Sequence, residues 1–310
     1  MPYAIRVHEV GGPEVLKWEE VEVGDPGPGQ VRLRQEAAGI NFIDVYHRTG
    51  LYPQPLPFTP GVANVKKGDR VAYAGVIGGY AEERLIDADK VVKLPDAIPT
   101  EQAAAAMLQG MTVHMLLRRV YPVKAGDTIL IHAAAGGVGL IACQWAKALG
   151  ATVIGTVGND EKAALARAHG CDHPIVYTRE DFVAEVERIT GGKKLPVVYD
   201  SVGKDTFLKS LDCLAPRGLM VSFGNASGPP DPIAPGLLQQ KGSLFLTRPT
   251  INNYTATRAE LEQAASELFG VLASGAVKVE VKQRFALKDA AEAHRALEGR
   301  KTSGSTVLTV

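Results

Sequence analysis

The sequence is poor in cysteine and carries no net charge, and both absences exclude broad classes of protein. Cys143, Cys171 and Cys213 are its only cysteines among 310 residues, and none forms a CxxC pair. They are too few and too far apart for a disulfide framework, which favours a reducing, cytoplasmic setting. Lys plus Arg total 34 and Asp plus Glu total 34, whereas binders of nucleic acid or membrane surfaces normally carry a basic excess. The charge balance therefore argues against a nucleic acid or a membrane as partner.

The sequence also lacks a long apolar segment. Its first residues, MPYAIR, show no basic region followed by the apolar run of a secretory signal. An uncharged stretch over residues 128–146 is interrupted by Gly136-Gly137, where its apolar pattern changes. This stretch predicts a strand, a turn and a helix rather than a membrane span. With 45% apolar and 22% charged residues, the composition is typical of a globular protein with a buried core.

Both ends of the chain are predicted to be rich in β-strands. The turn cluster DPGPG at 25–29 excludes a helix or a central strand there. QVRLRQ at 30–35 alternates polar and apolar residues as a half-buried strand does, and GDRVAY at 68–73 indicates a turn that enters another strand. The tail combines two helices, expected over 258–272 and 288–297, with two strands, expected over 277–285 and 306–310.

The middle of the chain shows a different pattern of secondary structure. Between residues 122 and 247, short apolar or β-branched runs alternate with helical patterns of about ten residues. The strands are expected over 128–133, 152–156, 175–177, 196–200 and 219–223, and the helices over 139–149, 160–169, 182–190 and 207–214. This alternation predicts an α/β fold with a doubly wound parallel sheet. We expect a β-rich domain over 1–110, a nucleotide-binding domain over 111–247, and a return to the first domain over 248–310.

A glycine-rich turn, AAAGGVG at 133–139, joins the first of these strands to its helix. Its small residues let the backbone turn tightly and approach a pyrophosphate. The free N–H groups and the dipole of the following helix favour the negative charge. Any tight strand-to-helix turn can carry glycines, but this one opens a run of several β/α units. We therefore predict that Ala135, Gly136, Gly137 and Val138 bind a dinucleotide.

The second strand of the middle region favours NADPH over NADH. NAD-binding proteins usually carry an acid at the end of this strand, on the ribose hydroxyls. Here the strand ends in GTVG at 155–158, and Gly155 and Thr156 are expected beside the cofactor. Asp160 stands near the expected distance, but it fits the first turn of the next helix better. Lys162, one turn into that helix, is predicted to reach a 2′-phosphate, and a solvated helix charge is the alternative.

Further segments complete a specific pattern over nearly the whole chain. They are AGINFIDVY at 38–46 with RTGLY at 48–52, GDRV at 68–71, LQGMT at 108–112, the AAAGGVG turn and VSFG at 221–224. The combination resembles the quinone oxidoreductases of the zeta-crystallin type, in the zinc-free branch of the medium-chain dehydrogenase/reductase superfamily. The resemblance implies a GroES-like catalytic domain made from both ends of the chain, with a Rossmann domain inserted between them. It also implies a homodimer formed through the Rossmann sheets.

The same superfamily contains zinc alcohol dehydrogenases, so a metal has to be considered. Those enzymes carry a cysteine ligand at the position of Asn41 and a lobe with four structural cysteines, and this chain has neither. Zinc needs several Cys, His or carboxylate ligands in tetrahedral geometry. Of the seven histidines, only His169 and His173 are close in sequence, with Cys171 between them at the predicted end of a helix. We predict a zinc-independent protein.

The resemblance also assigns residues to the catalytic site. It places Asn41, Asp44 and Tyr46 near the nicotinamide and the substrate cleft, and Thr112 beside the nicotinamide. Tyr52 is predicted to stack on or hydrogen-bond to a planar substrate. Local roles are the alternatives, because Asn and Asp often cap helices, half-buried tyrosines often have hydrated hydroxyls, and helical threonines often bond to backbone.

Further cofactor contacts follow from the resemblance. Tyr177, after the third strand, is expected near the adenosine phosphate. Phe223 and Gly224 are candidates at the carboxyl edge of the sheet, and Phe245, Leu246 and Thr247 are candidates on its sixth strand. Arg300 and Ser305 are candidates in the loop that returns to the cofactor. Relatives often have lysine where this chain has Ser305.

The sequence departs from the family pattern at one place. In the family, a segment with a glutamate and several glycines lies between FTPGV at 58–62 and ANVKKGD at 63–69, and here it is missing. Either the protein itself has a deletion, or the segment exists in the protein and is absent only from this sequence. A true deletion would remove strands from the catalytic barrel and leave unpaired edges beside the cleft.

The expected function is that of an NADPH-dependent quinone reductase, in which the nicotinamide passes hydride or electrons to a small-molecule quinone. A quinone is already a good electron acceptor, so no strong acid or base is required, and the sequence shows no evident His or Lys relay. Two alternatives remain. One is an enone or alkenal reductase, which reduces an activated carbon–carbon double bond, and the other is a non-catalytic, crystallin-like NADPH-binding protein.

Overall fold

The structure, a computed structural model, describes residues 1–57, 59, 70–299 and 302–310. The chain divides into two units. Unit 1 contains Met1–Met111, Thr255–Gly275 and Val279–Val310, and unit 2 contains Thr112–Tyr254 and Ala276–Lys278. Unit 2 is therefore inserted into the sequence of unit 1, and the first crossing falls inside helix α2 (Thr100–His114).

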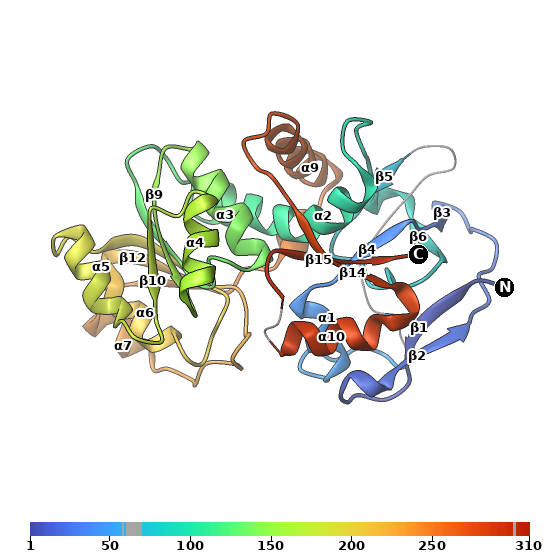
Figure 1. Cartoon of the computed structure of the whole chain (residues 1–310), viewed down its shortest axis with the longest axis horizontal. Coiled ribbons are helices and arrows are strands. Elements are labelled where there is room, and N and C mark those ends of the chain that lie inside the picture. The colour runs from blue at the N-terminus through green and yellow to red at the C-terminus, as the bar shows by residue number, and fades with distance from the viewer. Residues whose placement is uncertain (58, 60–69, 300–301) are drawn as a thin grey trace. The chain divides into compact units, whose positions relative to one another are not determined.

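Unit 2 is built on a six-stranded sheet in which all neighbouring strands are parallel (Figure 1). Its strands are β8 (Thr128–Ile131), β9 (Thr152–Val157), β10 (His173–Val176), β11 (Leu195–Asp200), β12 (Leu214–Ser222) and β13 (Phe245–Thr247). They are ordered β10-β9-β8-β11-β12-β13, which is the order of a dinucleotide-binding Rossmann sheet. The predicted α/β class with a doubly wound parallel sheet is confirmed.

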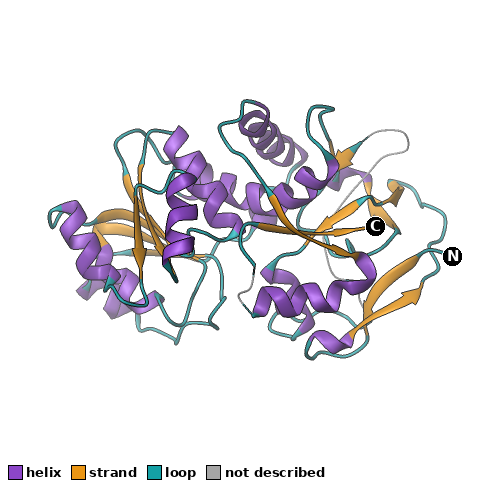
Figure 2. Cartoon of the chain, in the orientation of Figure 1, coloured by secondary structure: helices purple, strands orange, loops and turns teal. Residues whose placement is uncertain are grey.

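Helices alternate with these strands along the chain (Figure 2). They are α3 (Gly137–Ala148), α4 (Asp160–Ala168), α5 (Phe182–Thr190), α6 (Phe207–Ser210), α7 (Pro235–Gln240) and α8 (Ile251–Tyr254), with a π-helical turn over Met115–Val120 and a 3-10 turn over Leu211–Cys213. Asn159 caps α4, since its side chain accepts a 2.9 Å hydrogen bond from the Lys162 N–H. Gly191, in the left-handed conformation at φ +58°, ends α5.

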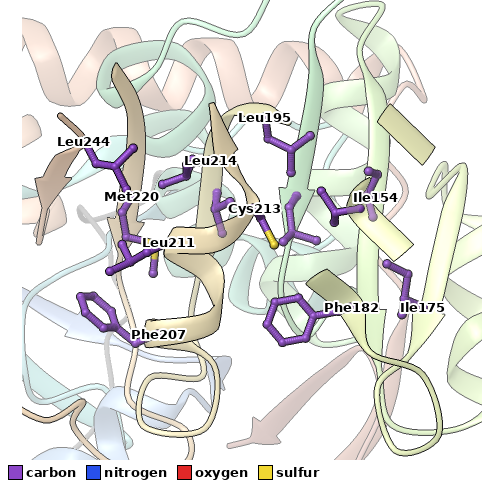
Figure 3. Packing of buried hydrophobic residues seen from close by; sticks show 13 residues of the cluster. Ile154, Ile175, Phe182, Leu195, Phe207, Leu211, Cys213, Leu214, Met220 and Leu244 are labelled. Atoms are coloured by element: carbon purple, nitrogen blue, oxygen red, sulfur yellow. The ribbon is translucent and has the colours of Figure 1, made fainter. Parts of the chain in front are cut away.

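The apolar side chains of α5 and α6 pack against one face of the sheet (Figure 3). Phe182 and Phe207, one from each helix, are buried in the same cluster as the strand residues Ile154, Ile175 and Met220. Each large apolar side chain removed from water in this way stabilises the fold by about 1.5–3 kcal/mol. The strands of unit 2 are thereby held in a fixed order, and their carboxyl ends form one edge of the sheet.

Unit 1 contains the remaining strands, arranged in small sheets. The antiparallel pairs are β1 (Tyr3–Val7) with β2 (Leu16–Glu20), β3 (Gln30–Arg34) with β6 (Glu83–Asp87), and β5 (Val71–Ala72) with β7 (Val92–Lys93). A three-stranded sheet has the order β14 (Val281–Ala286), β15 (Ser305–Thr309) and β4 (Ala37–Gly39). The helices are α1 (Phe42–Arg48), most of α2, α9 (Arg258–Ala273) and α10 (Ala290–Glu298), with 3-10 turns at Pro13–Val15, Ala88–Lys90 and Leu287–Asp289.

Helix α2 is the main element that the sequence patterns did not predict. Its sequence, TEQAAAAMLQGMTVH, has apolar residues all around the helix and no clear polar face, as buried helices do. At Gly110, an added Cβ would lie 2.4 Å from a methyl carbon of Leu268 on α9, so the two helices approach closely there. The tail strand also begins later than expected, at Val281, because residues Ala276–Lys278 belong to unit 2.

None of the helices in the described ranges is long and apolar enough to cross a membrane. The junction between Val62 and Ala63, where the family segment is missing, lies outside the described residues, and so does Arg300.

Candidate functional site

The turn after β8 fits a pyrophosphate. Ala133 adopts a left-handed conformation at φ +54°, and the Gly136 N–H donates to its carbonyl oxygen at 2.9 Å. Helix α3 then begins at Gly137 with Gly136 as its N-cap, and no side chain caps it. The N–H groups of its first turn are therefore available to an anion. A Cβ on Gly139 would lie 2.3 Å from the Ala133 oxygen, so only glycine allows this close approach.

Gly155 and Thr156, on β9, pack against this turn. A Cβ on Gly155 would lie 2.6 Å from the Ala134 Cβ and 2.7 Å from the Cys171 sulfur. The Thr156 carbonyl accepts a 3.0 Å hydrogen bond from the Ala134 N–H, and the buried Thr156 hydroxyl lies 2.8 Å from Nδ1 of His132. The Thr156 side chain is thus engaged in the core, and the proximity of Gly155 and Thr156 to the cofactor stays a prediction.

His132 belongs to a buried polar network that sequence reasoning missed. Its Nε2 lies 2.8 Å from the Ser210 hydroxyl, which donates to the Thr206 carbonyl. The Ser210 oxygen therefore accepts from Nε2, and Nδ1 accepts from Thr156, which is the pattern of a neutral imidazole. Burial lowers the pKa of His132, although Asp200 opposes this shift. The Thr206 hydroxyl in turn donates to both oxygens of Asp200, so the network links the ends of three central strands.

The end of β9 carries the groups predicted to select the cofactor. Asp160 is the first residue of α4 and receives two hydrogen bonds from Arg179, at 2.7 and 2.5 Å. This guanidinium lowers the pKa of the Asp160 carboxyl. The Tyr177 hydroxyl lies 3.3 Å from the position of a Cβ on Gly158, so its ring lies beside the strand end. Lys162 is half-exposed one turn further along α4.

The other half of the carboxyl edge is formed by β12 and β13. The Phe223 N–H donates to the Asp200 carbonyl at 2.8 Å, and a Cβ on Gly224 would lie 2.4 Å from the Ser201 oxygen. Of the three candidates on β13, only Thr247 stands at its carboxyl end. Phe245 starts that strand and is 62% exposed, and Leu246 is 40% exposed. Their contacts with the cofactor stay a prediction.

In unit 1, Asn41 and Asp44 form a capping box at the start of α1. The Asp44 Oδ2 accepts from the Asn41 N–H at 2.8 Å and from the Tyr80 hydroxyl at 3.0 Å. Asp44 is almost completely buried. The structure therefore gives this carboxylate a capping role, which was the alternative to a direct catalytic one.

Tyr46 and Tyr52 lie together. Their rings pack edge to face with centroids 5.2 Å apart, and the Tyr52 N–H donates to the Tyr46 carbonyl at 3.0 Å. Phe42 adds a third ring, 6.3 Å from Tyr46. Thr112, the remaining catalytic candidate, is half-buried in the part of α2 that belongs to unit 2.

Gln109 is a site residue that the sequence patterns did not single out. Its Nε2 donates to the Asn41 Oδ1 at 3.3 Å, and its Oε1 accepts from the Ser305 hydroxyl at 2.9 Å. Ser305 is buried and its hydroxyl is engaged by Gln109, and its contact with the cofactor stays a prediction. A single polar side chain within AAAAMLQGM was the signal that pointed to this position.

Tyr80 and His294 form a buried pair of side chains next to Asp44. The Tyr80 hydroxyl lies 3.3 Å from Nε2 of His294, and burial together with Arg48 lowers the pKa of His294 to about 3. Burial raises the pKa of Tyr80 well above its usual value. Arg48 is fully buried and forms a 2.7 Å ion pair with Glu298.

Comparisons with known proteins cover the whole chain. A family model described as zinc-binding dehydrogenase matches residues 137–270. Within the ranges that the structure describes, no three His, Cys, Asp or Glu side chains gather as a metal site. A quinone oxidoreductase from Pseudomonas aeruginosa is 53% identical over 323 residues, covering 99% of each chain. That match is longer than the 310 residues of this chain, so part of the relative has no counterpart here.

Two further relatives are informative. The structure of Escherichia coli quinone oxidoreductase complexed with NADPH has a TM-score of 0.96 and 50% identity, and the match covers 99% of this chain and all of that one. A 2-haloacrylate reductase from Burkholderia is 46% identical over 330 residues, with 99% of each chain covered. Identity at this level over the full length, on the same fold, leads to one conclusion: the chain belongs to the quinone oxidoreductase family of the medium-chain dehydrogenases and reductases.

Proposed function

We propose that the chain is an NADPH-dependent quinone reductase. The observation that carries the proposal is the match over 99% of both chains to a quinone oxidoreductase, together with the NADPH in the E. coli relative. The uncapped start of α3 and the tight approach at Gly139 support a dinucleotide in unit 2. We assign unit 2 to the cofactor and unit 1 to catalysis. NADPH, when bound, supplies a hydride or electrons to the quinone.

Charge at the end of β9 supports the preference for NADPH. A free carboxylate there would hydrogen-bond to ribose hydroxyls and repel a 2′-phosphate. In this chain the Asp160 carboxylate is paired with the Arg179 guanidinium, and Lys162 lies two residues further along the same helix. We propose that Lys162 binds the phosphate and that Tyr177 lies against the adenosine end.

The side chains of unit 1 are proposed to position the substrate. Tyr46 and Tyr52 offer paired aromatic surfaces to a planar ring, and Asn41 offers a polar group beside them at the start of the same helix. Burial keeps His47 and His294 neutral by lowering their pKa values. Neither is therefore suited to deliver protons at neutral pH, and a quinone, as a good electron acceptor, requires no strong acid.

We propose that two copies associate through the edge strand β13. This strand pairs with β12 on one side, and Phe245 and Leu246 are exposed on it. An exposed apolar edge strand is a template for pairing with another strand. A second copy, related by twofold symmetry, would continue the sheet and bury these side chains. The three free, buried cysteines are in keeping with work in the reducing cytoplasm.

We propose that the reaction is zinc-independent. Asn41, at the position of a zinc ligand in zinc-dependent relatives, is engaged by Gln109 and by the capping box. Elemental analysis of protein purified without added metal is expected to find far less than one zinc per chain. One zinc per chain, removed by a chelator with loss of turnover, would contradict this expectation.

Reduction of an activated carbon–carbon double bond is the second candidate, favoured by the 46% identity with a 2-haloacrylate reductase. Stopped-flow oxidation of NADPH with quinones, enones and 2-haloacrylate separates the candidates. We expect the highest kcat/KM with a quinone. A higher value with an enone or with 2-haloacrylate would favour the second candidate. NADPH binding without turnover of any acceptor would indicate a non-catalytic binding protein.

A further inference from the structure

Three polar side chains from distant parts of the sequence form a buried chain in unit 1. Ser305, on β15, donates to Oε1 of Gln109 on α2, and Nε2 of Gln109 donates to Oδ1 of Asn41 at the start of α1. Gln109 is 8% exposed and Ser305 is 3% exposed, whereas Asn41 is half-buried. The chain therefore runs from the interior of unit 1 towards its surface and ends on the residue proposed to face the reacting rings.

The direction of these hydrogen bonds fixes the orientation of each amide. A primary amide has an acceptor oxygen on one side and a donor NH2 group on the other. Because the oxygen of Gln109 accepts from Ser305, its NH2 group faces Asn41 and meets the oxygen of that residue. The Asp44 N–H donates to the backbone carbonyl of Asn41 at 3.0 Å, so Gln109 is the neighbour that selects the side-chain oxygen of Asn41.

The backbone of Asn41 is fixed as well. Its N–H donates to Asp44, whose carboxylate also accepts from Tyr80. The only remaining freedom of Asn41 is rotation of its side chain. The NH2 group of Asn41 has no hydrogen-bond partner within the described part of the chain. Because Asn41 is only half-buried, this NH2 group is available as a donor to a bound molecule.

We infer that Ser305 and Gln109 are positioning residues that hold the NH2 group of Asn41 outward, as a donor to a carbonyl oxygen at the reacting centre. The inference rests on the proposed function for the identity of that carbonyl, which belongs either to the quinone or to the carboxamide of the nicotinamide. Such a donor stabilises negative charge on the oxygen without reorganising when the charge develops.

The substitution Gln109→Glu tests the direction of the chain. At neutral pH a carboxylate only accepts hydrogen bonds, so it keeps the Ser305 bond but forces Asn41 to turn its NH2 group inward. If the hydrogen bonds ran the opposite way, the substitution would leave Asn41 as it is. Ser305→Ala removes the donor that orients Gln109. Thr306→Val is the matched control, because the neighbouring hydroxyl on β15 donates to Gln283 and not to Gln109.

Side-chain amide exchange, measured by NMR on protein labelled at Asn and Gln, reports the orientation without any turnover. In the unmodified protein the NH2 group of Gln109 is expected to exchange slowly and that of Asn41 quickly. In Gln109→Glu the Asn41 group is expected to become slow. A slowly exchanging Asn41 group in the unmodified protein would overturn the inference. The exchange rates can be measured even if the protein reduces no quinone. A failure of the proposed function is therefore distinguished from a failure of this inference.

Kinetics then identify the carbonyl. We expect Gln109→Glu and Ser305→Ala to lose about tenfold or more in kcat/KM, and Thr306→Val to keep the activity of the unmodified protein. A fall in kcat with unchanged NADPH affinity assigns the donor to the quinone, and weaker NADPH binding assigns it to the carboxamide. In an Asn41→Ala background, neither Gln109→Glu nor Ser305→Ala should lower kcat/KM any further. A full additional loss in that background would show a merely structural role and contradict the inference.

Discussion

Lys162 is the single residue on which we expect cofactor choice to depend most. A Lys162→Ala substitution should weaken NADPH binding by about 1.5–3 kcal/mol, roughly tenfold or more, because a charge-assisted contact with the 2′-phosphate is lost. NADH binding should change little. Titration of both cofactors, followed by nicotinamide fluorescence, measures the two affinities. Lys193→Ala is the control, because Lys193 is an exposed lysine in the loop after α5. Equal affinities for NADPH and NADH in the unmodified protein would contradict the assignment.

Two buried histidines make stability depend on pH. The pKa of His294 is lowered to about 3, and burial also lowers the pKa of His132. Both are neutral in the fold but bind a proton near pH 6.5 when unfolded, so the unfolded state takes up more protons below that pH. The free energy of unfolding should therefore be constant above about pH 7 and fall on acidification, by up to about 1.4 kcal/mol per pH unit for each histidine.

Urea unfolding followed between pH 7.5 and pH 5 checks this dependence. A His294→Gln variant should unfold more easily at neutral pH, because its buried environment is disturbed, but its stability should decline less steeply with falling pH. Stability that stays constant or rises towards pH 5 in the unmodified protein would show that these imidazoles are already charged in the fold.

Some residues of the candidate site are marked by their neighbours in the sequence, and others meet only in the folded chain. The glycines of the 133–139 turn were predictable, because a close backbone approach requires small residues in the sequence. Asn41 was found by resemblance alone. Gln109 and Ser305 were not predictable as its partners, since they lie far away in sequence and meet only when α2 and β15 pack. The same holds for the network of His132 with Ser210 and Thr206.

Among the elements, the junction between β8 and α3 depends on Gly139, because a glycine has no side chain to clash there. A Gly139→Ala substitution would place a methyl group 2.3 Å from the Ala133 oxygen, which is backbone and has little freedom to move. We expect a loss of stability of about 1–3 kcal/mol, together with much weaker NADPH binding, because the helix start must shift. Gly270→Ala on α9 is the matched control, since a methyl group there meets nothing within 4 Å.

Thermal unfolding and NADPH titration compare the two variants. If Gly139→Ala bound NADPH as tightly as the control, the close approach of α3 to the strand would not be needed for the cofactor.

Elements were predictable where their pattern was periodic. Strands β8 to β12 and helices α3 to α6 were located to within a few residues, because strongly apolar strands alternate with helices there, whereas α7 and α8 were not predicted. Helix α2 was missed, since apolar residues all around it leave no amphipathic pattern to mark it. Helix α1 is short, and its start is marked only by Asn41 and Asp44, which are equally common in turns.

At the scale of the whole molecule, we expect the state of association to depend on β13. A Phe245→Lys substitution places a charge on the exposed edge strand and should convert the proposed dimer to a monomer, because two charges would be buried at a twofold interface. Leu208→Lys is the control, since this leucine is 50% exposed on α6. Sedimentation velocity distinguishes the two states. A monomeric unmodified protein would refute the proposed interface.

The order of synthesis sets when the site of unit 1 is completed. β15 pairs with β4, so the sheet beside Asn41 joins residues 37–39 to residues 307–309, and Ser305 reaches Gln109 only through this pairing. Residues 112–254 of unit 2 leave the ribosome earlier and contain all six strands of their own sheet. At about 5–20 residues per second, a nascent chain would therefore hold a folded cofactor unit for several seconds before Asn41 is oriented.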